Sequence, residues 1–119
     1  MTAMSKYLYG IIEEPQSKTF ELSGLAGAAV YTINSGDLAA VVSDIELSEI
    51  DPTRKNVLAH TMVQDGILKI YTFIPMGFGM VATNESSVRS LLEKNYLGLI
   101  NELKRLAGKI EVELKIFWE

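Results

Sequence analysis

Two apolar runs enclose a short polar segment in the stretch AVYTINSGDLAAVVS, residues 29–43. Both runs, residues 29–33 and 38–43, contain the β-branched residues that favour strands. The segment between them, Asn-Ser-Gly-Asp, has the composition of a turn, because asparagine and glycine tolerate a positive φ. The stretch therefore predicts a β-hairpin.

Further strands are expected on both sides of this hairpin. Residues 7–12 (YLYGII) have strand composition and are followed by the sequence Glu-Glu-Pro. Residues 109–119 alternate between apolar and charged side chains, which is typical of a strand with one buried face. Residues 16–27 are mixed in composition and carry two glycines, so we expect a surface loop there.

Two helices are expected between the hairpin and the last strand. Asp51 and Pro52 are suited to a helix start, as a cap and as the first helical residue, and apolar residues at helical spacing extend to Ile70. Asn84 is the expected cap of a second, longer helix, whose apolar stripe runs to Gly108. Glycine just beyond the stripe is a common helix end.

The element order is therefore β-β-β-α-β-α-β, and it predicts an α+β protein. Placing both helices on one face of the sheet is the simplest way to bury two amphipathic stripes. We expect a two-layer sandwich, and residues 1–119 are expected to form a single domain.

Composition excludes several classes of function. The net charge is −4 with 11 lysines and arginines, which argues against a nucleic-acid-binding protein. The chain has no cysteine, so disulfides and thiolate metal sites are excluded. Its uncharged runs are too short to cross a bilayer, and we expect a soluble, cytoplasmic protein that does not bind membranes.

The stretch IPMGFGMVA, residues 74–82, satisfies the G-x-G-x-x-A form of a dinucleotide-binding fingerprint. That fingerprint requires a strand-to-helix turn, whereas Met80 to Ala82 continue a strand-like run, so nucleotide binding is disfavoured. The single histidine, His60, lies among apolar neighbours and is expected to be a partly buried residue that is hydrogen-bonded locally. No catalytic or metal-binding constellation is recognised, and we expect a protein that is not an enzyme and needs no cofactor.

Five segments, taken in order along the chain, resemble the gas vesicle protein family GvpL/GvpF. They are YLYGII at residues 7–12, GDLAAVVS at 36–43, LAHTMV at 58–63, IPMGFGMV at 74–81 and LKRLAGKIEV at 103–112. No single motif is specific, but the ordered set is. One departure is that Gly77 stands where the family has an arginine, so any charged contact of that arginine would be missing here.

The resemblance implies a ferredoxin-like fold and a non-enzymatic accessory role, either structural or in assembly, in gas vesicle formation. It implies binding to the main shell protein GvpA, and possible contacts with other gas vesicle accessory proteins, at the gas vesicle inside the cell. Family members are about twice as long, so the chain is expected to correspond to their N-terminal domain.

The resemblance and the composition together suggest a partner-binding surface in residues 74–82. Pro75 cannot donate to a strand ladder and indicates an edge or a bulge. Met76, Phe78 and Met80 would supply adaptable apolar contacts to the partner. Alternatively, Phe78 packs into the core while the glycines relieve a bend. A different class of function, a ferredoxin-like regulatory module that binds a small metabolite, also remains open.

Overall fold

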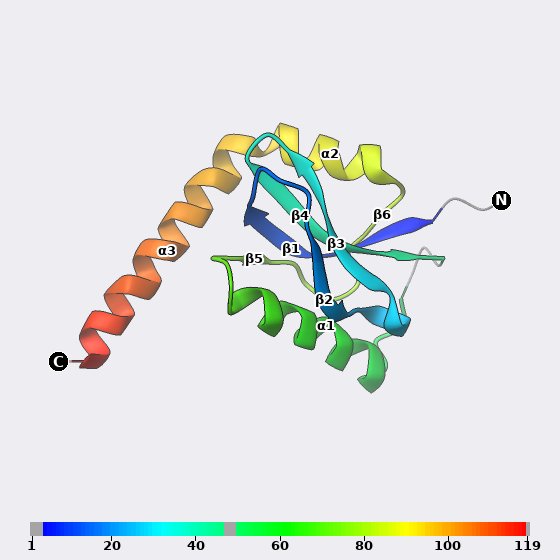
Figure 1. Cartoon of the computed structure of the whole chain (residues 1–119), viewed down its shortest axis with the longest axis horizontal. Coiled ribbons are helices and arrows are strands. Elements are labelled where there is room, and N and C mark those ends of the chain that lie inside the picture. Colours follow the sequence, from blue (N-terminus) through cyan, green and yellow to red (C-terminus); the bar gives the residue numbers. More distant parts are fainter. Residues whose placement is uncertain (1–3, 47–49, 119) are drawn as a thin grey trace.

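The computed structural model describes residues 4–46 and 50–118, with side chains described as far as residue 107. It contains one antiparallel sheet with helices on both sides (Figure 1). The strands are β1 Ser5–Glu13, β2 Thr19–Ser23, β3 Ala29–Ser35, β4 Leu38–Ile45, β5 Ile74–Pro75 and β6 Val81–Ala82. The helices are α1 Arg54–Leu68, α2 Glu85–Lys94 and α3 Tyr96–Trp118, with a 3₁₀ turn, η1, at Leu25–Gly27. The strand order is β2-β3-β4-β1-β5, and β6 also pairs with β1.

The predicted hairpin is confirmed as β3 and β4. Ser35 pairs with Leu38, so the connecting turn contains only Gly36 and Asp37. Gly36 has a φ of 58°, in the left-handed region that glycine enters at little cost. The sequence of the turn therefore fixes the register of the two strands.

β1 lies between β4 and the edge formed by β5 and β6, and a β-bulge sets the directions of its side chains. The pairing with β4 shifts between Leu8 and Gly10, so that Tyr9 is the extra residue. Tyr7 and Tyr9 consequently share one face of the sheet with Ile12, while Leu8 and Ile11 lie in the core on the other face.

The sheet has a separate hydrophobic core on each face. Val63 and Ile67 of α1 belong to one core, called the α1-side core below. Val88 and Leu92 of α2 belong to the other, together with Leu103 of α3. Figure 1 shows α1 and α2 on opposite sides of the strands. The expectation that both helices cover one face is therefore wrong, and the ferredoxin-like two-layer sandwich is not confirmed. The α+β class is retained, with three layers.

The sequence carries a signal for this arrangement. YLYGII in β1 and LAAVVS in β4 are continuous buried runs rather than alternating ones. A strand with apolar residues in successive positions must be covered on both faces. These runs could have predicted a layer of helices on each side.

The predicted helix boundaries are partly wrong. Asn84 caps α2 as expected, accepting a hydrogen bond from the Ser87 amide at 2.8 Å. Thr53, rather than Asp51, caps α1, since its hydroxyl accepts from the Asn56 amide. The long second helix is two helices, because Asn95 has non-helical φ and ψ and donates its side-chain amide to the Leu91 carbonyl.

Two strand assignments also require correction. Residues 109–118, expected as a strand, continue helix α3 to Trp118. Alternation alone does not form a strand without a neighbouring strand to pair with, and four of the ten residues in this segment are glutamate or lysine, which favour helices. Residues 19–23, expected within a loop, form β2, a short edge strand in which Phe20 and Leu22 pack against the α1-side core.

Ala26 in η1 is the one non-glycine residue with a positive φ in the described part of the chain, at 54°. An L-residue in this region costs about 1–2 kcal/mol, and glycine avoids that cost while losing more chain entropy on folding. We expect Ala26→Gly to raise the free energy of unfolding by about 0.5–1 kcal/mol. Urea denaturation would measure this. Ala29→Gly, in the extended backbone of β3, is the matched control and should lower stability.

Candidate partner-binding site

Residues 74–82 form one interrupted edge strand that runs antiparallel to β1. Its first part, β5, pairs with Gly10 and Ile11, and its second part, β6, pairs with Lys6 and Tyr7. Between them, Met76 to Met80 bulge out of the sheet; this segment is called turn 76–80 below. The Met76 amide donates to the Tyr9 carbonyl, and the Leu8 amide donates to the Met80 carbonyl. Both ends of the turn are therefore bound to β1.

The local backbone explains why the motif is not a dinucleotide fingerprint. Gly77 and Gly79 lie between two strands, and α2 begins only at Glu85. Gly79 has a φ of 93°, so the second glycine is required by the turn itself. The position of Gly77 is open, because a Cβ placed there would meet no atom within 4 Å.

A chain of hydrogen bonds holds turn 76–80 from beneath. The Gly79 amide donates to the Tyr7 hydroxyl oxygen at 3.1 Å, and this hydroxyl lies 2.8 Å from Nδ1 of His60. Nε2 of His60 lies 3.1 Å from the Met76 carbonyl oxygen. Because a carbonyl can only accept, Nε2 carries a hydrogen, and in the neutral imidazole Nδ1 accepts from the tyrosine hydroxyl. The Tyr7–His60 pair thus connects residue 79 of the turn to residue 76.

Gln64, one helical turn after His60, also binds the first residue of turn 76–80. Its side-chain amide donates to the carbonyl oxygens of both Tyr9 and Met76 at 2.9 Å. Burial raises the pKa of Tyr7, so its hydroxyl remains a donor at neutral pH. Burial also lowers the pKa of His60, which keeps the imidazole neutral, although the bond to Met76 acts in the opposite direction.

The four residues that the sequence suggests for partner binding differ in their burial. Phe78 is half-buried against the α1-side core, with its ring centroid 5.6 Å from His60 and 6.1 Å from Tyr7. Met76 is half-buried against the opposite core. Pro75 and Met80 are exposed, Met80 with 46% of its surface accessible. Of the four, these two are therefore the ones directed toward a potential partner.

The roles of Tyr7 and Gln64 were not predicted from the sequence, and only local bonds were expected for His60. His60 in fact bonds to residues 53 and 16 positions away. A signal was available, because a tyrosine inside a buried strand needs a hydrogen-bond partner for its hydroxyl. Two such tyrosines stand in YLYG, and Tyr9 is paired as well, accepting from the Leu25 amide and donating to Ser43 Oγ.

A second group of titratable residues is formed by Lys6, Tyr31 and Asp44. The Lys6 ammonium lies 2.7 Å from the Asp44 carboxylate, and the Tyr31 hydroxyl donates to the same oxygen. Partial burial opposes ionisation of Asp44, but the hydrogen bonds from Lys6 and Tyr31 hold its pKa below the usual range. The three groups satisfy one another and join β1, β3 and β4, so we interpret them as a structural ion pair.

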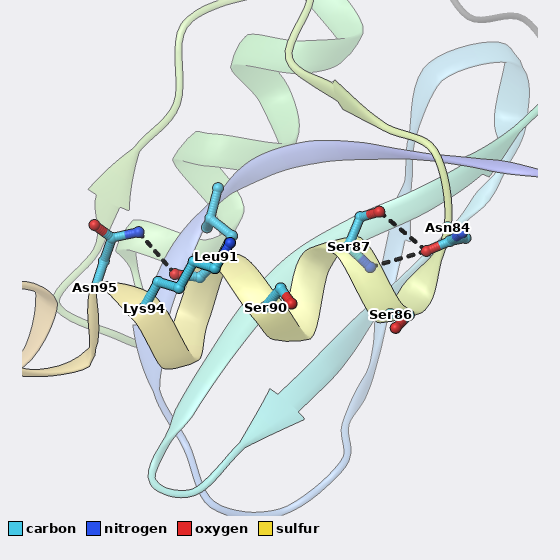
Figure 2. A pocket seen from close by; sticks show the side chains of 7 residues that line it. All are labelled: Asn84, Ser86, Ser87, Ser90, Leu91, Lys94 and Asn95. Carbon is cyan, nitrogen blue, oxygen red and sulfur yellow. Dashed lines mark hydrogen bonds between the residues drawn. The ribbon is translucent and has the colours of Figure 1, made fainter.

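A surface depression of about 580 Å³ follows the outer side of α2 (Figure 2). Figure 2 shows Asn84 bonded to Ser87 at the start of the helix, and Asn95 bonded to the Leu91 carbonyl at its end. Asn84 and Asn95 are occupied in capping, whereas Ser86, Ser90 and Lys94 also line the open depression. Within residues 4–46 and 50–107, no three histidine or acidic side chains gather as a metal site.

Comparison with known proteins identifies the family. The model of the family "Gas vesicle synthesis protein GvpL/GvpF" matches residues 5–119, nearly the whole chain. The chain belongs to the GvpL/GvpF family. This agrees with the resemblance carried by the five sequence segments.

GvpL/GvpF relatives match over almost the full length of the chain. Gas vesicle protein F2 of Halobacterium salinarum is 33% identical over 98% of this chain and 55% of its own length. Gas vesicle protein F of Nostoc sp. is 32% identical over 95% of this chain and 48% of its own length. The crystal structure of GvpF from Anabaena sp. PCC7120 superposes with a TM-score of 0.76 at 27% identity, covering 89% of this chain and 46% of that one.

The chain therefore spans about half the length of the GvpL/GvpF relatives it matches. The helices of the described residues offer no segment with the length and apolar character needed to cross a bilayer. The family of the chain and its fold therefore agree.

Proposed function

We propose that the chain is a non-enzymatic accessory protein of gas vesicle formation that binds the shell protein GvpA through the outer side of turn 76–80. The family supports the gas vesicle role. The observation that supports this surface is the exposed Met80 on a turn fixed from beneath by Tyr7 and His60.

A fixed turn is suited to binding for a physical reason. Ordering a mobile loop on association costs free energy, and a turn already held in place avoids much of that cost. Methionine is flexible and polarizable, so it adapts to an apolar partner surface. Pro75, exposed beside the turn, adds apolar area and cannot donate a hydrogen bond, so it leaves no amide to desolvate there.

We further propose that residues 1–119 act as one domain, corresponding to the N-terminal half of the longer family members, and that the chain works at the gas vesicle. Other gas vesicle accessory proteins are additional candidate partners of this domain.

The test is the affinity of the purified chain for solubilised GvpA, compared between wild type and Met80→Glu. A carboxylate placed in an apolar contact must be desolvated, so we expect binding to weaken about tenfold or more. Phe78→Ala is less informative, because Phe78 packs on His60 and Tyr7 and its loss would disturb the turn itself.

Leu97→Glu is the matched control, since Leu97 is 76% exposed at the start of α3, outside turn 76–80. It should leave the affinity unchanged. Equal affinities of Met80→Glu and wild type would exclude this surface, and no binding by the folded wild-type chain would contradict the proposed partner.

A further inference from the structure

His60 lies beneath turn 76–80, where its protonation state bears on the turn whatever the identity of the partner. We propose that the Tyr7–His60 pair is a pH-sensitive latch, which holds turn 76–80 closed while His60 is neutral and releases it when His60 is protonated.

The hydrogen-bond directions given above are those of a neutral imidazole. Nδ1 of His60 accepts from the Tyr7 hydroxyl, and Nε2–H donates to the Met76 carbonyl. Protonation adds a hydrogen at Nδ1, so the Tyr7 hydroxyl can no longer donate there. Its oxygen would then face two donors, His60 and the Gly79 amide, while its own hydrogen loses its acceptor.

Among residues 4–46 and 50–107, the surroundings of His60 offer no negative charge to stabilise an imidazolium. From β1, the titratable groups that face His60 are Tyr7 and Tyr9, and burial raises the pKa of both. The segment from residue 72 to residue 84 contains no titratable side chain at all.

Among the described residues, the other elements near His60 also place no negative charge beside it. On α1, the side chains buried with His60 are Val63 and Ile67, and the nearby Gln64 is neutral. η1 has no titratable residue, and Glu21, the one in β2, is exposed. His60 itself is 95% buried, with 5% of its surface accessible. A positive charge here is therefore both desolvated and unpaired.

The sign of the pH effect follows from these contacts. An opened turn exposes His60 to water, where its pKa returns to about 6.5. The closed turn binds the proton less well, so opening takes up a proton and is favoured as the pH falls below about 6.5. The opening equilibrium should increase by up to about tenfold per pH unit until the pKa of the closed form is reached.

Amide hydrogen exchange by NMR on the purified chain tests this between pH 7.5 and 5.5. The readout is the protection factor of the Gly79 amide, corrected for the intrinsic exchange rate. The internal control is the Leu25 amide, which donates to Tyr9 in a similar chain that continues through Ser43 to the Ala29 carbonyl and contains no histidine. We expect the protection of Gly79 to fall by up to about tenfold relative to that of Leu25.

His60→Gln keeps a side-chain amide donor but cannot titrate, so the difference between the two amides should become independent of pH. If that variant does not fold, ring ¹⁵N shifts of the wild-type histidine decide the question. The proposal requires an Nε2–H tautomer at pH 7.5 and a pKa below 6.5. An Nδ1–H tautomer, a pKa at or above 6.5, or a constant protection ratio in the wild type would overturn it.

Discussion

Replacing Gly10 by alanine is expected to lower the free energy of unfolding by about 3 kcal/mol or more, the upper range for overpacking a core. A Cβ at this position would lie 2.1 Å from Cζ of Phe73 and 2.5 Å from the carbonyl oxygen of Ile74. Phe73 is buried in the α1-side core, and Ile74 pairs with Ile11 of β1. Neither neighbour can move without separating β5 from β1.

Urea denaturation would measure the loss, and Gly77→Ala is the matched control on the same edge strand. A Cβ at Gly77 meets nothing within 4 Å, and its φ lies outside the positive region, so we expect a change within about 0.5 kcal/mol. Similar midpoints for Gly10→Ala and wild type would contradict the close packing of residues 73–75 on β1.

Leu92→Ala should lower the free energy of unfolding by about 2–5 kcal/mol, the range for removing a large buried aliphatic side chain. Leu92 has no accessible surface and joins α2 to the core formed by Leu8, Ile33 and Val42, among others. The effect tests directly whether α2 covers the sheet face opposite α1. Thermal or urea unfolding followed by circular dichroism would give the value.

Leu97→Ala is the control, because it makes the same substitution at an exposed helical position. It should change the free energy of unfolding by less than about 0.5 kcal/mol. Combining Leu92→Ala with Ile67→Val, a truncation in the core on the other face, should give additive losses, since the two cores are separated by the sheet. A Leu92→Ala effect no larger than that of Leu97→Ala would contradict the three-layer fold.

Local sequence patterns predicted the hairpin and the first strand, because turn chemistry and β-branched runs act over a few residues. These patterns failed where the secondary structure or the packing of a segment depends on residues far away in the sequence. Residues 109–118 alternate like a strand, yet they continue α3. The side on which a helix packs is equally non-local, although the uninterrupted apolar runs of β1 and β4 already indicated two covered faces.

In the candidate site, too, local features could be predicted from the sequence and contacts between distant residues could not. The glycines and the proline of IPMGFGMVA correctly indicated an edge with a bend. The bonds that hold the bend could not be predicted, since Tyr7, His60 and Gly79 are far apart in the sequence and meet only when α1 packs on β1. The sequence also could not show that Met76 and Phe78 point into opposite cores, leaving Met80 outside.

The most direct test of the proposed function is photo-crosslinking to GvpA from two positions of the chain. Benzoylphenylalanine would replace Met80 in one sample and Leu97 in another, since both positions are exposed. Binding through turn 76–80 predicts a crosslinked product with GvpA from position 80, reduced by excess unlabelled chain, and little or none from position 97. Equal yields from the two positions, or a product from position 97 alone, would contradict it.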